Sequence, residues 1–425
     1  MGQSHSNIPA LYSQLEDLID NGFKLRDSAN LDAFSRLRTS HPEALFSYKS
    51  EYSLGSLIFE PGATGTGVTP TYSSTSGMTA ISCTAGTGVS YLQSFQYIPY
   101  QAGKSQFIPI TGLIGAAVAN VTVDTGWFDA NDGVFFRQNG TTNLQFVVRS
   151  SASGSVVNNA VAQADWNLDT LDGTGASGIT LDITTTQIII FDLQLLFMGR
   201  VRVGFDIGGN IVYCHEFTHA NSSALPYMRS GTLPIQMLVT STSSASTKTA
   251  YFKCVAVLSE GGDTSYEDLA YNFSTPSVSL TASSGARTHA ISLRPLTTFN
   301  SRTNRCSIIQ PVVEILVTGN NPVYWELCIG QAITSSTWTS VNSTHSSSEY
   351  GTGTISGSPV VVIASGFVSA SNQLKQQTTR GVVSRYPICL DRAGAVRANG
   401  TLSLLLTGLG GTSACYVSMD FKEIR

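Results

Sequence analysis

The sequence predicts an all-β protein with two β-sandwich domains, of jelly-roll or lectin-like type, preceded by one N-terminal amphipathic α-helix. From about residue 52 onward, short runs rich in Val, Ile, Thr, Phe and Tyr alternate with clusters of Gly, Ser and Asn. Only 12% of the 425 residues are charged, about half the usual fraction, so Ser, Thr, Asn, Gln and Gly must cover most of the surface. Clear helical periodicity is confined to the first 30 residues.

The N-terminal helix is predicted over residues 1–30. Ser6 or Asn7 can cap it, and Pro9 suits its first turn. Its apolar residues recur every three or four positions, as in a coiled-coil seam: Ile8, Leu11, Leu15, Leu18 and Leu25. Two interpretations of this stripe stand side by side. The helix packs on its own domain, or it self-associates or docks into a partner.

The remaining chain divides by composition into four expected parts. These are a connecting anchor segment (31–51), a first sandwich (52–262), a linker (263–280) and a second sandwich (281–425). In the first sandwich, residues 201–207 alternate apolar and polar side chains, a Gly-Gly-Asn turn follows, and residues 211–218 return as the second strand of a hairpin. Strands of the second sandwich are expected at 307–317, 323–329, 360–364, 402–407 and 416–421. The Ser/Thr/Gly-rich residues 334–357 are expected to form an exposed loop.

Composition excludes several classes of protein. The net charge of −4 leaves no electrostatic footprint for nucleic acid. No apolar run reaches the roughly 20 residues that span a membrane, and no secretory signal is recognisable. The seven cysteines are dispersed without a C-x-x-C pair, which indicates buried small hydrophobic residues rather than disulfides or a zinc site.

His215, Glu216 and His219 match the H-E-x-x-H pattern of zinc peptidases. That chemistry requires a helix, whereas these residues continue the alternation of a predicted strand. On a strand, two residues four positions apart are separated by roughly 13 Å, too far to share a zinc ion with ligands at about 2.0–2.1 Å. We therefore set the peptidase interpretation aside, and we expect no enzymatic activity and no required cofactor.

A second group of polar residues resembles the start of a calcium loop, because alternate oxygens can converge on one hard cation. The candidate Ca²⁺ ligands are Asp165, Asn167, Asp169 and Asp172. The pattern departs from an EF-hand, since Thr170 replaces the expected glycine and Ala176 the expected glutamate. Asx-turn hydrogen bonding to nearby backbone is the favoured alternative.

Several segments resemble a family of virion structural proteins of tailed bacteriophages. Residues 32–40, Asp-Ala-Phe-Ser-Arg-Leu-Arg-Thr-Ser, followed by Pro42 and Leu45-Phe46, resemble the family opening D-A-F-G-R-L-R-V-S-x-P-x-x-L-F, with Ser35 in place of glycine. Further similarity covers 133–149, 163–178, 199–221, 227–229, 233–235 and 421–425. The resemblance implies a particle component located in the virion, and it implies no catalytic residues.

From these observations we expect a non-enzymatic virion protein that assembles on a phage capsid or tail through its N-terminal region. The expected partner-binding residues are Phe34, Arg36 and Arg38 together with the apolar stripe of the helix. The stripe also suggests a homo-oligomer, with a trimer favoured. The alternative is a carbohydrate- or receptor-binding module of a tail or capsid fibre, which would contact a host-surface glycan through Trp338.

Overall fold

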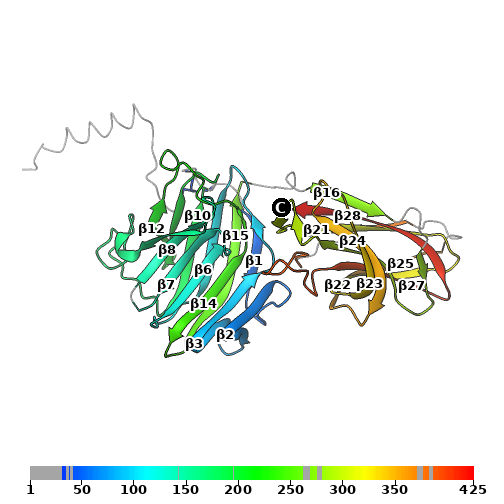
Figure 1. Cartoon of the computed structure of the whole chain (residues 1–425), viewed down its shortest axis with the longest axis horizontal. Coiled ribbons are helices and arrows are strands. Elements are labelled where there is room, and N and C mark those ends of the chain that lie inside the picture. Colours follow the sequence, from blue (N-terminus) through cyan, green and yellow to red (C-terminus); the bar gives the residue numbers. More distant parts are fainter. Residues whose placement is uncertain are drawn as a thin grey trace, which may run out of the picture.

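The computed structural model describes residues 31–34, 38, 42–141, 143–194, 196–261, 269–274, 280–370, 377–381 and 386–425. The described chain is almost entirely β, which confirms the predicted fold class for this part (Figure 1). The predicted helix over 1–30, with its apolar stripe, lies outside the described residues, as does Arg36. In the part of the chain that is described, no helix has the length and apolar character needed to cross a membrane.

The first unit is a 13-stranded antiparallel sheet folded into two layers. Its order is β12-β11-β10-β5-β15-β3-β14-β6-β7-β8-β9, with β1 paired to β15 and β2 to β3. The strands are β1 (Pro42–Lys49), β2 (Phe59–Ser73), β3 (Met78–Ser94), β5 (Ser105–Leu113), β6 (Val121–Phe128), β7 (Gly133–Asn139), β8 (Asn143–Ser150), β9 (Val157–Ala162), β10 (Thr186–Leu193), β11 (Val201–Ile207), β12 (Asn210–Phe217), β14 (Ile235–Ser244) and β15 (Lys248–Glu260). Two short strands, β4 (Ile98–Pro99) and β13 (Thr232–Leu233), pair separately, and η2 (Gln163–Asp165) is a 3-10 turn.

Aromatic side chains join the two layers of this first sandwich. Phe136 of β7 meets Phe205 of β11 edge to face, with ring centroids 5.5 Å apart. Phe146 of β8 lies 6.4 Å from Phe191 of β10. All four are buried in one hydrophobic core, because alternate residues of each strand point to the same face. On β10 and β11 the core-facing residues are therefore odd-numbered, and the even-numbered ones face outward.

The second unit is a sandwich of a five-stranded and a six-stranded antiparallel sheet, in the orders β16-β28-β21-β26 (with β17 on β28) and β23-β24-β18-β27-β22-β25. The strands are β16 (Leu269–Ser274), β17 (Leu280–Ala282), β18 (Thr288–Pro295), β21 (Ser307–Val317), β22 (Val323–Ile329), β23 (Ala332–Ser340), β24 (Ser348–Ser356), β25 (Val361–Val368), β26 (Gln377–Gly381), β27 (Leu402–Gly408) and β28 (Ser413–Ile424). A small hairpin joins β19 (Thr298–Phe299) to β20 (Arg302–Thr303). Phe273 stacks on Tyr350 across the layers at 4.9 Å.

Strands that the sequence predicted by periodicity are present. β11 and β12 form the expected hairpin, and β21 and β22 have the predicted bounds. All seven cysteines are free, as expected, and six of them are buried; Cys254 is half-buried. Trp325 is fully buried in the second core.

Three segments differ from their predictions. Residues 334–357, predicted to be a loop, form most of the β23–β24 hairpin, because exposed Thr and Ser support strands as well as loops. The predicted linker 263–280 contains β16, which pairs with β28. The predicted connecting segment 31–51 contains β1, which pairs along its length with β15 and so belongs to the first sheet.

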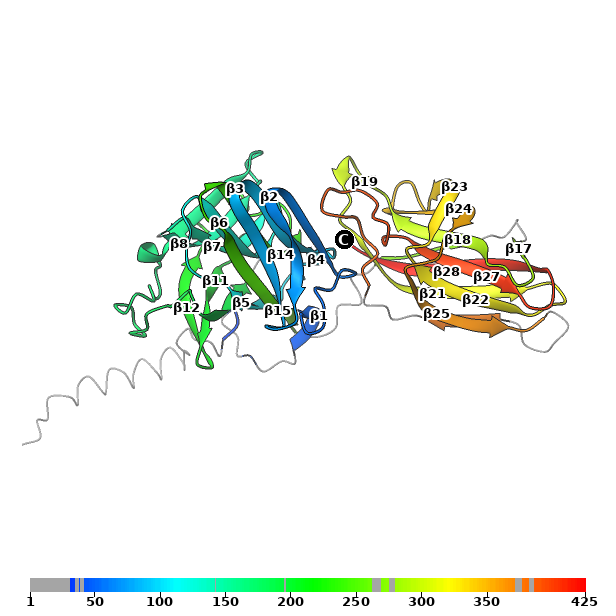
Figure 2. The same cartoon turned by 90° about the horizontal axis from the view of Figure 1, so that it is seen from below.

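The two units contact each other through a loop of the second unit that follows residue 386 (Figure 2). Nη1 of Arg392 donates to Oε1 of Gln93 at 3.0 Å and to Oε1 of Gln236 at 2.6 Å, both in the first sandwich. The Arg397 guanidinium lies over the Phe95 ring, 3.7 Å from its centroid. These contacts fix one sandwich against the other.

Candidate functional site

A row of residues directly opposite one another crosses the outer face of the first sandwich. Glu216 of β12 is opposite Arg202 of β11, Arg202 is opposite Asp192 of β10, and Asp192 is opposite Phe107 of β5. Directly opposite residues in an antiparallel sheet point to the same face, so this register alone brings two carboxylates and an arginine together. Leu258 of β15 continues the row, and Glu260 lies two residues further on the same face.

A β-bulge adds Tyr213 to this row. The register of β11 and β12 shifts so that Val203 faces His215 while Gly204 faces Tyr213, which leaves Cys214 as the extra residue. Tyr213 and Glu216, three positions apart, can therefore share one face. Gly204 is required at this point, because a Cβ atom there would lie 2.1 Å from the Val212 carbonyl oxygen.

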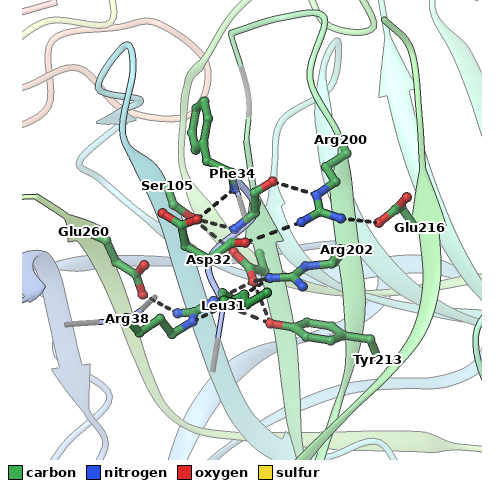
Figure 3. A network of polar contacts seen from close by, with 12 residues as sticks. Leu31, Asp32, Phe34, Arg38, Ser105, Arg200, Arg202, Tyr213, Glu216 and Glu260 are labelled. Atoms are coloured by element: carbon green, nitrogen blue, oxygen red, sulfur yellow. Dashed lines mark hydrogen bonds and ion pairs between the residues drawn. The ribbon is translucent and has the colours of Figure 1, made fainter. Parts of the chain in front are cut away.

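Asp192 is the centre of the site, which we call the arginine clamp after Arg38, Arg200 and Arg202. Figure 3 shows these arginines with Leu31 and Asp32 of the N-terminal segment. The Asp192 carboxylate is fully buried and accepts hydrogen bonds from four side chains. Oδ2 accepts from Nη2 of Arg202 at 2.7 Å, from the Tyr213 hydroxyl at 2.6 Å and from Nη2 of Arg38 at 2.5 Å, and Oδ1 accepts from the Ser105 hydroxyl at 3.1 Å. Charge-assisted bonds of this kind are about twice as strong as neutral ones.

The clamp holds the backbone of the N-terminal segment. Nη2 of Arg202 and Nε of Arg38 donate to the Leu31 carbonyl oxygen at 2.7 and 3.2 Å. Nε of Arg200 donates to the Ala33 carbonyl at 2.6 Å. Leu31, Asp32 and Ala33 are all at most 3% exposed. This segment therefore covers the outer face of the sheet and is itself buried by it.

Ion pairs connect the charged residues of the clamp. Arg38 pairs with both Asp192 and Glu260, Arg202 pairs with Asp192, and Arg200 pairs with Glu216 at 3.0 Å. Burial alone would lower the pKa of Arg38, but Asp192, Tyr213 and Glu260 raise it above its ordinary value. Burial and the neighbouring Asp192 raise the pKa of Tyr213 strongly. Arg38 therefore stays charged, and Tyr213 stays a hydrogen-bond donor.

This arrangement is suited to holding a chain segment in place. Both carboxylate oxygens of Asp192 accept hydrogen bonds from the protein. Arginine side chains do not act as proton donors in acid–base chemistry, so these bonds hold the segment rather than transfer protons. Among the described residues, no group of three or more His, Cys, Asp or Glu is placed to hold a metal ion.

Sequence reasoning identified Arg38 and Phe34 in this site but missed the residues that surround them. Arg38 has a 19% exposed side chain, and Phe34 is half-buried. A signal for two of the missed residues was present, because Asp192 and Arg202 interrupt apolar strands in a chain with few charges. Partner binding by Phe34, Arg36, Arg38 and the helix stripe stays a prediction.

Two of the residues considered for calcium, Asp169 and Asp172, are used in local hydrogen bonds, and the Asn167 side chain bonds the backbone of Glu216 on β12. Oδ1 of Asp169 accepts from the Leu171 N–H at 2.9 Å, and Oδ1 of Asp172 accepts from the Thr174 N–H at 2.9 Å. Hydrogen bonds from the hydroxyls of Thr174 and Thr170 lower the pKa of Asp172 to about 2. Asp165 lies in η2. These backbone bonds of Asp169 and Asp172 are of the Asx-turn type, and calcium binding stays a prediction.

The two histidines of the H-E-x-x-H pattern occupy different surroundings. His215 lies on β12 with its ring 4.5 Å from that of Phe217, and its Nδ1 accepts from the Asn167 N–H at 3.2 Å. His219 follows the end of the strand and stacks on Tyr227 at 4.3 Å. The segment is therefore a strand through Phe217, as predicted, rather than the helix that a zinc peptidase requires.

Trp338, the candidate for glycan stacking, is half-buried on β23. The Arg294 guanidinium lies 3.7 Å from the centroid of its ring, and its Nε1 donates to the Ser336 hydroxyl at 2.9 Å. The ring is therefore held in a fixed orientation, with one face covered.

No protein-family model matches the chain, and no curated protein matches it. Among solved structures it is similar to a β-glucanase of Bacillus licheniformis, at 12% identity and a TM-score of 0.32, over 52% of this chain and 98% of that one. It is also similar to a legume lectin-like domain from Entamoeba histolytica, at 8% identity and a TM-score of 0.31, over 52% of this chain and 99% of that one.

Proposed function

We propose that this chain is a non-enzymatic structural protein of a phage virion, attached through its N-terminal region and presenting two β-sandwiches. The observation that supports the proposal is that the segment held by the arginine clamp is the one that resembles the virion family. Residues 32–40 are those that resemble the opening motif of the virion family, and Asp32, Ala33 and Arg38 of that motif lie in the arginine clamp.

The arginine clamp fixes the proposed attachment region to the first sandwich. A terminal segment that transmits force must not peel away from its domain, and the buried bonds at Leu31, Ala33 and Asp192 oppose peeling. The Arg392 contacts then connect the first sandwich to the second, so a load applied at residue 31 reaches the whole described chain. Two layered sandwiches with few charges also suit a part that packs among other proteins.

The test is a deletion of residues 1–30 in a phage genome that encodes this chain. The deletion must stop there, because residues 31–33 are buried and Pro42–Lys49 is a strand of the first sheet. We expect the shortened chain to fold but to be missing from purified particles, as measured by immunoblot against a constant capsid protein. A chain with Arg302→Ala, a substitution at an exposed position on β20 of the second sandwich, is the control that should be incorporated normally. Normal incorporation of the shortened chain would refute attachment through the N-terminal region.

Carbohydrate binding by the second sandwich is the alternative function. The observation that favours it is Trp338, a half-buried aromatic ring held rigid on a Ser/Thr-rich hairpin, as a sugar-stacking surface requires. A glycan array would test it directly: binding that is lost in Trp338→Ala and kept in the chain without residues 1–30 would support this role. Because Asp169 and Asp172 are used in local bonds, we expect EDTA to have no effect.

A further inference from the structure

The last strand of the six-stranded sheet presents an apolar surface to solvent. β25 pairs with β22 and stands at the end of the sheet among the described strands, along the lower margin of the second unit in Figure 2. Its sequence, Val-Val-Ile-Ala-Ser-Gly-Phe-Val, has no charged residue. Phe367 is 69% exposed, Val362 is 42% exposed, and Val360, just before the strand, is 52% exposed.

A β-bulge gathers these side chains on one face. Phe367 is opposite Tyr324 and Val362 is opposite Cys328, and the register shifts between them so that Ile363 is an extra residue. In a regular strand without a bulge, positions 362 and 367 are five residues apart and would point to opposite faces. The Phe367 ring also contacts Tyr324, with centroids 5.1 Å apart. Val362 and Phe367 therefore lie on the outer face of the sheet, with Ser365 between them.

Charges beside Val362 and Phe367 are already paired. Arg287 donates twice to Glu326, at 2.6 and 2.8 Å, and Glu326 is only 5% exposed. A charged partner would therefore find no counter-charge here. Exposed edge strands normally carry lysine, proline, inward-pointing charges or a β-bulge that prevents pairing with other chains. β25 has none of these side chains, and its bulge at Ile363 lies outside residues 364–368.

We propose that β25 is a contact between two copies of this chain, in which two β25 strands pair antiparallel about a two-fold axis. Pairing centred on Gly366 places Phe367 opposite Ser365 of the second copy on the outer face, and Ala364 opposite Val368 on the inner face. Faces therefore match across the axis, and Gly366, which has no side chain, leaves room beside the Phe367 rings. A second copy supplies an equally uncharged, apolar strand, and the two six-stranded sheets become continuous. This contact does not depend on a role in a virion.

The test is sedimentation equilibrium of the full chain over a range of concentrations. Phe367→Asp places like charges near each other across the axis, and Val157→Asp, at a 53% exposed position on β9 of the first sandwich, is the matched control. We expect wild type and the control to have about twice the average mass of Phe367→Asp, because an isologous contact joins copies in pairs. Equal masses for wild type and Phe367→Asp would overturn the proposal.

Hydrogen exchange provides a second readout that needs no variant. Raising the wild-type concentration should slow amide exchange in peptides covering residues 361–368, since strand pairing protects backbone N–H groups. Protection at this strand that rises only on addition of a glycan or of another protein, with the chain remaining at its lowest mass, would exclude the contact between copies.

Discussion

Asp192 lies directly opposite Arg202 in the β10–β11 ladder, and its Oδ2 accepts a 2.7 Å hydrogen bond from Nη2 of that arginine. Both residues are fully buried, although they project from the outer face of the sheet. They are buried because the segment that includes Leu31 covers them, and that segment is held by the same arginine. Docking of the N-terminal segment therefore completes the burial of this ion pair in the first sandwich.

Replacing Asp192 should destabilise the first sandwich strongly. Asp192→Asn leaves the buried Arg202 and the partly buried Arg38 without their shared counter-charge, and removing one member of a buried pair costs about 3–5 kcal/mol. Urea unfolding followed by tryptophan fluorescence measures this loss. Glu51→Gln, which breaks the exposed ion pair with Lys49, is the control and should leave the stability close to that of wild type. A loss at Asp192 no larger than the control's would show that the clamp contributes little.

The alternation of apolar and polar residues predicted much of this fold, because that alternation depends only on residues that are close together in the sequence. The β11–β12 hairpin follows from the alternation before Gly208-Gly209, and β21 and β22 follow from their apolar alternation. The β23–β24 hairpin was missed because its exposed Thr and Ser residues carry no apolar period. The β16 strand was missed because its stability comes from pairing with β28, about 150 residues away.

The arginine clamp could be predicted only in part, because most of its contacts join residues far apart in the sequence. Asp192 and Arg202 are ten residues apart, and a hairpin prediction places them opposite each other. Arg38 lies 154 residues from Asp192 and 222 from Glu260, so no local pattern indicates that these three side chains meet. The resemblance at residues 32–40 marked the segment, but it did not indicate what the segment binds.

Arg38 should control whether the N-terminal segment stays docked. Arg38→Ala removes bonds to Asp192, Glu260 and the Leu31 carbonyl, and each hydrogen bond to a charged group contributes about 1.5–3 kcal/mol. Chymotrypsin cleavage after Phe34 should therefore accelerate about tenfold or more, as measured by mass spectrometry of timed digests. Arg38→Lys keeps the positive charge but loses the planar guanidinium, which donates to several acceptors at once. Its rate of cleavage after Phe34 should therefore lie between those of wild type and Arg38→Ala. Unchanged cleavage in Arg38→Ala would mean that Arg200 and Arg202 suffice.

His289 should make the second sandwich sensitive to acid. Its imidazole is buried, accepts from the Gly353 N–H at Nδ1 and bonds the Ser292 hydroxyl through Nε2 at 2.7 Å. Burial lowers the pKa of His289 to about 4. The unfolded chain, with a histidine pKa of about 6.5, binds this proton more readily, so stability is complete above pH 6.5 and falls as the pH drops from 6.5 to 4.

The expected loss over that range is at most about 3 kcal/mol. Urea unfolding at a series of pH values measures it. His289→Gln should flatten the decline between pH 6.5 and 4, whereas His345→Gln, at an exposed position, should leave it as in wild type. If His289→Gln kept the wild-type slope, other groups would be responsible for the acid sensitivity.

Arg392 should hold the two sandwiches in one orientation. Its guanidinium donates to the amide oxygens of Gln93 and Gln236, so Arg392→Ala removes two hydrogen bonds that cross the interface while leaving both cores intact. Interfaces between domains of one chain permit relative motion unless specific contacts prevent it. We expect small-angle X-ray scattering to give a larger maximum dimension and a broader distance distribution for Arg392→Ala than for wild type. Arg302→Ala, at an exposed position of β20, should scatter like wild type. Identical curves for all three chains would show that the remaining contacts, such as Arg397 on Phe95, are sufficient to fix the orientation.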